Sequence, residues 1–271
     1  MLAQRVVTAA VLLVLFGLDL FLATSSLFAL SLAAIAAAAA WEWSRLSGVK
    51  GERGQIVYAS AVGLFALTVL QVPPGTGFLR WALLVGFLLW ACVPALLYLH
   101  PVRGPLMRTG VRRLVVGALA IGIAVLSIQY LRSHAPLASP WLLLYAFGVV
   151  WLMDIGAYFA GRRFGRRKLA PKISPGKTWE GVWGGMATVA VLCALVLLFG
   201  DWPAGTAAPL VLATLAAASM SVYGDLFESR LKRAAGRKDS SSLLPGHGGV
   251  LDRVDGVLAA LPTFAFLWAW L

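Results

Sequence analysis

Long apolar runs separated by short polar segments dominate the pattern of this 271-residue chain. A helix that crosses a bilayer needs about 20 mostly apolar residues. About nine runs approach or reach that length, which predicts an all-α polytopic membrane protein with about nine transmembrane helices. Pro94 lies inside the fourth run and predicts a kink there. The predicted helices cover residues 6–24, 26–43, 56–71, 78–99, 111–131, 140–160, 182–199, 206–223 and 253–271.

The composition excludes a water-soluble globule. The chain is 60% hydrophobic and 13% charged, with a mean hydropathy of +0.84, whereas soluble domains carry about 25% charged residues. Cys92 and Cys193 lie inside apolar runs, so neither a disulfide framework nor a thiolate metal site is predicted. The first 26 residues could also form a secretory signal peptide, but the predicted topology requires that this segment is retained.

The basic residues predict the orientation of these helices. Of the 23 Lys and Arg, all except Arg80 and Arg132 fall in connections predicted to lie on one side of the membrane. Cytoplasmic loops carry such an excess, so the N-terminus is predicted to be cytoplasmic and the C-terminus extracytoplasmic. The net charge of +12 therefore indicates membrane topology, and no nucleic-acid partner is expected.

The charged residues also divide the chain into two parts. Residues 1–131 have short loops with few acids and are interpreted as an N-terminal transmembrane scaffold. Residues 132–271 hold most of the 11 acids and are interpreted as a C-terminal catalytic region. Its two long cytoplasmic loops are predicted at 161–181 and 224–252.

Two positions in this region place carboxylates in unfavourable surroundings. Asp154 lies inside an apolar helix, where a charge costs about 2.5–3.5 kcal/mol on insertion scales. It should face a polar cavity and pair with a cation, and a purely structural ion pair is the alternative. Asp225 and Glu228 are predicted at the C-terminal end of the helix 206–223, three residues apart on one face. Acids oppose the helix dipole at that end, which favours a metal site at Asp225.

Asp252 and Asp255 are predicted to open the last helix. Acids in a first turn cap a helix well, so capping is a serious alternative for this pair. Together with Asp154 and Asp225 they could converge on one cation. Because the candidate ligands are carboxylate oxygens, with no His or Cys cluster, the pattern favours Mg²⁺.

The loop 161–181, GRRFGRRKLAPKISPGKTWEG, combines a basic run with a helix-start signal. The basic run could be a cytoplasmic anchor or a binder of anionic headgroups. Ser174 suits an N-cap and Pro175 the first helical position, so we expect a helix to begin there. Its free N–H groups, with Lys177 beside them, would form an anion site. The GKT tripeptide is no nucleotide P-loop, because Pro171 replaces the required Gly and no strand precedes it.

The segment from Ser229 to Asp255, SRLKRAAGRKDSSSLLPGHGGVLDRVD, is polar and lies between two apolar runs. Its basic residues and the Gly-rich turn around His247 suit a phosphate, because glycine lets the backbone approach closely. The segment also resembles the signature of the phosphatidate cytidylyltransferase family (CDP-diacylglycerol synthases). That signature reads S-x-hydrophobic-K-R, four residues, K-D, then P-x-H-G-G-x-x-D-R-x-D. The loop 161–181 and the preceding WLMDIGAYFAGR are similar to a second stretch typical of the family.

The resemblance implies an integral membrane enzyme that joins CTP to phosphatidate, giving CDP-diacylglycerol and pyrophosphate. It implies dependence on Mg²⁺, with room for a second cation such as K⁺, and a homodimer. The expected location is a bacterial cytoplasmic (inner) membrane, with the active site facing the cytoplasm and the acyl chains between helices.

Roles for individual residues follow from combining the resemblance with the charge pattern. The predicted metal ligands are Asp154, Asp225, Asp252 and Asp255. The predicted CTP-binding residues are Lys168, Lys172, Ser174, Lys177 and Thr178. The residues predicted to hold the lipid phosphate or the pyrophosphate are Lys232, Arg233, Lys238 and Arg253. Asp239 is expected to orient Lys238 or His247.

Two alternatives remain open at this level. A related enzyme could use CTP with another lipid, such as an isoprenoid phosphate or an archaeal ether lipid, because no motif identifies the acyl chains. A transporter would also have many helices and an intramembrane Asp154. Transporters often have paired halves with broken helices at matching positions, and no such repeat is visible here. Release of pyrophosphate from CTP would separate enzyme from transporter.

Overall fold

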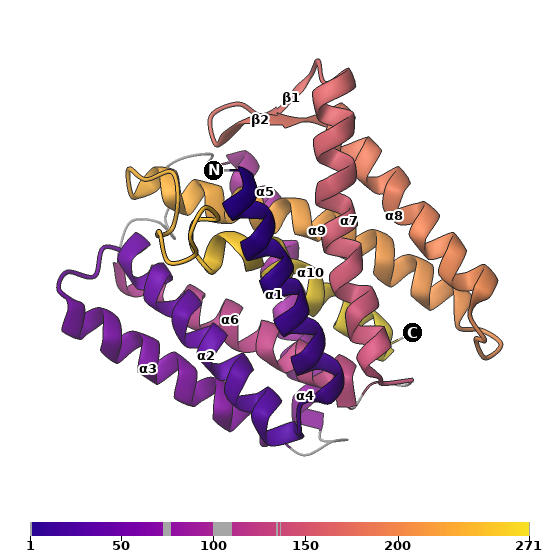
Figure 1. The fold of residues 1–271 in the computed structure, drawn as a ribbon, viewed down its shortest axis with the longest axis horizontal. Helices are drawn as coiled ribbons and strands as arrows, with labels where there is room; N and C mark the ends of the chain where they lie inside the picture. The colour runs from indigo at the N-terminus through magenta and orange to yellow at the C-terminus, as the bar shows by residue number, and fades with distance from the viewer. Residues whose placement is uncertain (1, 73–76, 100–109, 134, 136, 271) are drawn as a thin grey trace.

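The computed structural model describes residues 2–72, 77–99, 110–133, 135 and 137–270. Within these ranges the chain forms a helical bundle with one small pair of strands (Figure 1). The elements are α1 (Leu2–Leu22), α2 (Ser25–Leu46), α3 (Glu52–Val69), α4 (Gly77–Ala91), α5 (Val93–Leu99), α6 (Gly110–Ser133), α7 (Pro140–Phe164), β1 (Lys168–Ala170), β2 (Ser174–Thr178), α8 (Trp179–Phe199), α9 (Ala207–Ala234) and α10 (Leu251–Trp270).

Every apolar run that the pattern predicts to be helical is helical in the structure. The fourth run is interrupted between α4 and α5, next to Pro94, in agreement with the kink predicted there. Among the described residues, six helices are long and apolar enough to cross a membrane. An all-α membrane protein is therefore confirmed, while the count of nine spans stays a prediction. The basic residues Arg103 and Arg108, used above for orientation, lie outside the described residues.

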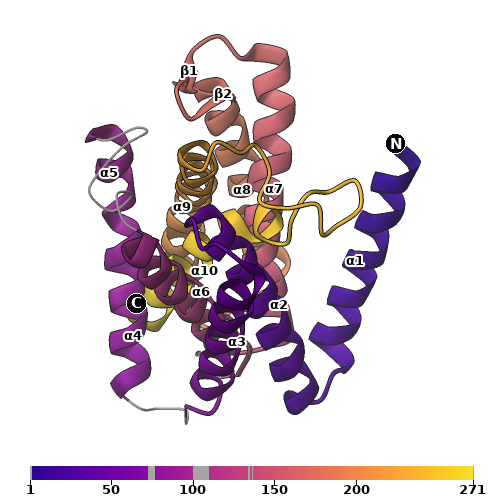
Figure 2. The same cartoon turned by 90° about the vertical axis from the view of Figure 1, so that its left-hand side faces the viewer.

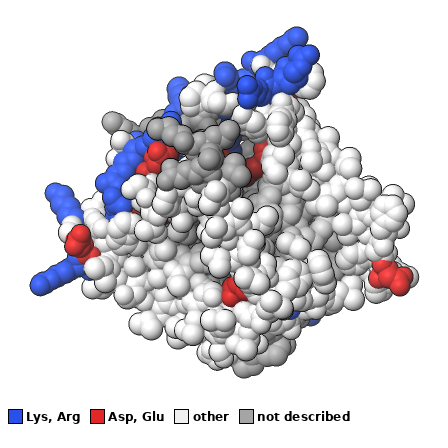
Figure 3. Space-filling model, in the orientation of Figure 1, with Lys and Arg blue, Asp and Glu red and all other residues white. Residues whose placement is uncertain are grey.

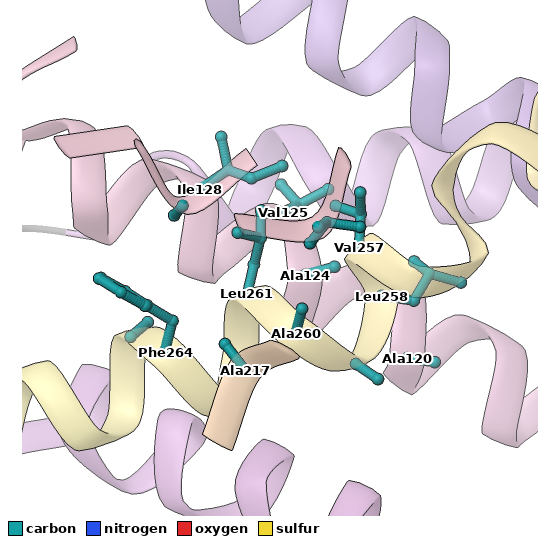
Figure 4. Close-up of a cluster of buried hydrophobic side chains, with 14 of the residues drawn as sticks. Ala120, Ala124, Val125, Ile128, Ala217, Val257, Leu258, Ala260, Leu261 and Phe264 are labelled. Carbon is teal, nitrogen blue, oxygen red and sulfur yellow. The ribbon is translucent and has the colours of Figure 1, made fainter. Parts of the chain in front are cut away.

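α10 lies inside the bundle and packs against α9, α6, α4 and α7. Figure 4 shows the buried cluster at its centre, where Leu261 and Phe264 of α10 lie near Val125 and Ile128 of α6. Small residues separate the larger ones and let the helix backbones approach closely, as is typical of helix packing in membranes. They are Ala120, Ala124, Ala217 and Ala260. Because α10 packs against several helices, its N-terminal end, which carries Asp252 and Asp255, is held in place.

α7 and α8 form a second tightly packed unit beside this core (Figures 1 and 2). Glycines make the contact close: a Cβ on Gly184 would collide with Ala160, and one on Gly185 would lie 2.6 Å from the Met153 carbonyl oxygen. The antiparallel β1–β2 pair connects the two helices at one end. This end of the α7–α8 unit carries the loop in which the sequence places the CTP-binding residues.

The predicted helix start at Ser174 is wrong. Ser174 and Lys177 lie in β2, and α8 begins at Trp179, where the Thr178 side chain accepts a hydrogen bond from the Gly181 N–H at 3.2 Å. Thr178 is thus the real N-cap, four residues after the expected one. The Trp179 N–H donates to the Arg167 carbonyl. Because Ser174 begins a strand rather than a helix, the free N–H groups expected from a helix start are not found at that position.

The predicted end of the helix 206–223 is also wrong. α9 continues to Ala234, so Asp225 and Glu228 lie inside the helix rather than at its C-terminus. Neither acid therefore opposes the helix dipole at the C-terminal end of α9, contrary to what the sequence suggested. The shared face is nevertheless real: Ser229 Oγ donates to Asp225 Oδ1 at 3.1 Å, and Lys232 forms an ion pair with Glu228.

Candidate active site

A cavity of about 490 Å³ lies between α7, β2, α8 and α9. Its charged lining consists of Asp154, Arg162, Lys177 and Asp225, and its polar lining includes Tyr158, Ser174 and Thr178. Lys177 Nζ lies 2.5 Å from Asp225 Oδ2, so one cation and one anion from different segments already meet here. Arg162 Nη1 donates to the Tyr158 hydroxyl at 3.1 Å. Cations and carboxylates in one cavity suit a ligand that brings both phosphates and a metal ion.

Two carboxylates from two helices, Asp154 and Asp225, line this cavity, and Asp255 of α10 is near enough to both to interact with them. The Asp154 carboxylate interacts electrostatically with Asp225, and the Asp255 carboxylate interacts with both. Lys177 partly neutralises all three of them. The donor chemistry fits a hard divalent cation such as Mg²⁺. As the side chains stand, no three acidic, His or Cys residues in the described part of the chain are close enough together to form a metal site.

Asp252 has a different environment from these three. It accepts from Lys232 Nζ at 2.7 Å and from the Gly249 N–H at 2.8 Å. It also accepts from the Ser240 N–H at 3.1 Å and lies 2.9 Å from Ser240 Oγ. Burial alone would raise the pKa of Asp252, but the bonds from Lys232 and the Gly249 N–H outweigh it and hold that pKa below its ordinary value. Asp252 is therefore an ionised carboxylate that closes the base of the loop 236–250.

Lys232 connects this loop base to α9. Its ammonium group bonds to Asp252 and also forms an ion pair with Glu228, whose side chain is almost fully buried. In this arrangement the Lys232 charge is used to hold two carboxylates. Its predicted contact with a phosphate stays a prediction.

The remaining predicted site residues fall into two groups. Arg233 lies between the loops, with Nε 3.4 Å from the Ile173 carbonyl oxygen, and the His247 N–H donates to the Leu244 carbonyl at 2.9 Å. His247 Nδ1 is buried and has no hydrogen-bond partner among the described residues. The other group has exposed side chains that do not line the cavity: Lys168, Lys172, Lys238, Asp239 and Arg253. Arg253 still interacts electrostatically with Asp154.

The structure also brings to the site several residues that have no predicted role. Glu42 of α2 is fully buried and accepts four hydrogen bonds at the base of the loop 236–250. Ser240 and Ser241 are its hydroxyl partners, and Arg162 and Tyr158 line the cavity. The available signal was an acid at the end of an apolar, alanine-rich helix. It could not identify a partner about 200 residues away along the chain.

Comparison with known proteins identifies the family of this chain. The sequence profile described as "Cytidylyltransferase family" matches residues 3–271. The chain belongs to the cytidylyltransferase family. A Pseudomonas aeruginosa protein named phosphatidate cytidylyltransferase is 40% identical over 273 residues, covering 99% of this chain and 98% of that protein.

Two further relatives carry the same name. The one from Haemophilus influenzae is 37% identical over 288 residues, 99% of each chain. The one from Bacillus subtilis is 45% identical over 130 residues, 47% of each chain. The resemblance inferred from the signature segment is thereby confirmed at the level of the family.

Proposed function

We propose that this chain is a phosphatidate cytidylyltransferase, which converts CTP and phosphatidate into CDP-diacylglycerol and pyrophosphate. The observation that carries the proposal is the cavity in which Lys177, Arg162, Asp154 and Asp225 meet, beside the signature segment. Full-length relatives with that name support the same assignment. A cavity of about 490 Å³ is within the usual range of about 300–1,000 Å³ for small-ligand sites.

The reaction requires one new bond between phosphorus and oxygen. A phosphate oxygen of phosphatidate attacks the α-phosphorus of CTP. The bond that breaks joins this phosphorus to the oxygen that bridges the α- and β-phosphates. The electron pair leaves with pyrophosphate. Because the attacking phosphate is already ionised, no strong general base is needed, and catalysis consists of positioning and charge neutralisation, as in other phosphoryl transfers. Lys177 and Arg162, which line the cavity, would neutralise the phosphate oxygens.

Dependence on Mg²⁺ is part of the proposal. Asp154, Asp225 and Asp255 would hold the ion, because they are hard oxygen donors that already interact with one another. Bound there, Mg²⁺ would supply positive charge to phosphate oxygens during transfer. Lys177 would then exchange its contact with Asp225 for one with the nucleotide. A second cation such as K⁺ and a homodimer rest on the family resemblance alone.

The orientation is proposed from the distribution of charge. Figure 3 shows Lys and Arg side chains gathered along the upper and left margins of the molecule, with few charged side chains over much of the rest of this face. If the basic margin faces the cytoplasm, as the positive-inside rule predicts, the cavity opens toward the compartment that supplies CTP. For a bacterial protein, this proposal places the enzyme in the inner membrane.

The test is an assay of purified protein in mixed micelles with CTP, phosphatidate and MgCl₂. We expect equimolar CDP-diacylglycerol and pyrophosphate. Parallel reactions replace phosphatidate with an isoprenoid phosphate or an ether-linked lipid phosphate. A product from one of these and none from phosphatidate would assign a different lipid substrate, and absence of pyrophosphate with every lipid would refute the enzyme. Omission of Mg²⁺, with EDTA, should abolish both products.

A further inference from the structure

Glu42 has four hydrogen-bond partners at the site, although it comes from the other half of the chain. Its side chain is 0% exposed. Oε1 accepts from Ser241 Oγ at 2.5 Å and from the Val250 N–H at 3.0 Å. Oε2 accepts from the Leu251 N–H at 2.6 Å and lies 3.0 Å from Ser240 Oγ. A carboxylate offers about four acceptor sites, so this buried charge is satisfied entirely by the signature segment.

These four partners lie at the two ends of one loop. Ser240 and Ser241 stand near its beginning, and Val250 and Leu251 stand where α10 starts. The first N–H groups of a helix lack partners within the helix and attract negative charge. Glu42 therefore caps α10 from outside and ties both ends of the loop 236–250 to α2.

The end of α2 is itself held firmly. Trp43, next to Glu42, is 1% exposed, donates from Nε1 to the Arg113 carbonyl at 2.8 Å and stacks on Phe227 of α9. Because α2 is held in place, Glu42 has a fixed position, and its hydrogen bonds in turn fix the position of the loop. The Ser240 hydroxyl extends the network, because it lies between Glu42 Oε2 and Asp252 Oδ2.

We propose that Glu42 is a positioning residue for the cytidylyltransferase reaction, which sets the loop 236–250 and the first turn of α10 in their active arrangement. It contacts neither the cavity lining nor any group that would touch the nucleotide. It acts through Ser240 and the α10 N-terminus on Asp252 and Asp255. This inference rests on the proposed function for its kinetic consequences, whereas its structural consequence can be measured without any activity.

Two substitutions separate positioning from packing. Glu42→Gln keeps the size of the side chain but replaces one acceptor oxygen with an N–H donor, which would face the N–H of Leu251 or Val250. Glu42→Asp loses a methylene group but keeps both acceptors. If Glu42 positions the loop by accepting hydrogen bonds, Asp should retain more activity than Gln. If it serves only to fill space, Gln should be the better replacement.

The kinetic expectation is a split between kcat and KM. Residues that hydrogen-bond to metal ligands and orient them typically contribute about ten- to hundredfold in metal affinity or activity. We expect Glu42→Gln to lower kcat by that factor, while the KM for CTP changes less than threefold, because β2 and α9 supply Lys177 and Asp225. Glu52→Gln, at an exposed position at the start of α3, is the matched control and should behave as wild type.

Hydrogen exchange gives the readout that needs no substrate. In Glu42→Gln the amides of Val250 and Leu251 should exchange at least tenfold faster, with α8 unchanged. If that variant does not fold, the double variant Ser240→Ala/Ser241→Ala removes two of the four donors and should show the same pattern to a smaller degree. Unchanged exchange at these amides, or Gln matching wild-type kcat, would overturn the inference. If wild type makes no CDP-diacylglycerol but exchange responds as expected, the proposed function fails and the positioning role stands.

Discussion

Gly249 lies in the signature loop beside Glu42, and a methyl group there should disable the loop. A Cβ at this position would lie 2.5 Å from both carboxylate oxygens of Glu42 and would collide with Ser240 Oγ. Ordinary contact begins at 3.4 Å, so in Gly249→Ala the carboxylate must retreat by about 0.9 Å. Its 2.6 Å bond from the Leu251 N–H would then exceed the usual limit of about 3.2 Å.

The cost can be estimated from these contacts. Inserting a methyl group into a packed site costs about 1–3 kcal/mol, and losing a hydrogen bond to a charged group costs about 1.5–3 kcal/mol. The same movement of the Glu42 carboxylate relieves the clash and breaks the hydrogen bond, so the two costs overlap. We therefore take about 3 kcal/mol for their combined effect. At about 1.36 kcal/mol for each tenfold change, the ordered loop becomes less populated relative to open forms by about a hundredfold.

The assay is CDP-diacylglycerol formation by Gly249→Ala at saturating CTP and phosphatidate, with hydrogen exchange of the loop 236–250 measured in parallel. We expect turnover to fall at least tenfold and exchange to rise. Gly148→Ala is the control, because a Cβ there meets nothing within 4 Å and α7 is helical at that position. If Gly249→Ala turned over within twofold of wild type, the close packing of this glycine against Glu42 would not be needed to hold the loop, and the reasoning would be wrong.

Three further substitutions test other parts of the site. Asp252→Asn should abolish nearly all turnover in a protein that still inserts and folds, since the amide cannot accept from both Lys232 and the Gly249 N–H; near-normal product formation would contradict this. Lys177→Ala should chiefly raise the KM for CTP, because Lys177 lines the cavity, and a change confined to the KM for phosphatidate would reverse the assignment of the two loops. Thr178→Ala removes the N-cap of α8 and should cost about 1 kcal/mol, seen as a lower thermal midpoint that Thr178→Ser restores.

The helices could be predicted from the sequence because the membrane imposes a simple requirement. A backbone in lipid must satisfy its own hydrogen bonds, so a long apolar run has to be helical. The ends of α8 and α9 escaped prediction because they are polar and are decided by particular contacts. Ser174 and Thr178 both suit an N-cap, and the choice depends on the pairing of β2 with β1 and on the bond from Trp179 N–H to the Arg167 carbonyl. Such contacts between neighbouring segments leave no periodic signal.

The sequence predicted which residues belong to the site better than it predicted which of them lie together. Asp154, Lys177 and Asp225 were all predicted as site residues, and they do line one cavity. Asp252 was grouped with them as a metal ligand, whereas the structure shows it bonded to Lys232 and to the loop. Glu42 carried no predicted role because its four partners come from positions 240–251, and nothing in the local pattern of α2 points toward them.

The structure therefore separates two tasks at the site. Lys232, Ser240, Gly249 and Asp252 bond to one another and, with Glu42, shape the loop base. The charges that line the cavity come mostly from α7, β2 and the middle of α9. Asp255 joins the two, because it follows the capped first turn of α10 and interacts electrostatically with Asp154 and Asp225. A change at the loop base should thus reach the cavity through the position of Asp255, and should alter turnover before it alters nucleotide binding.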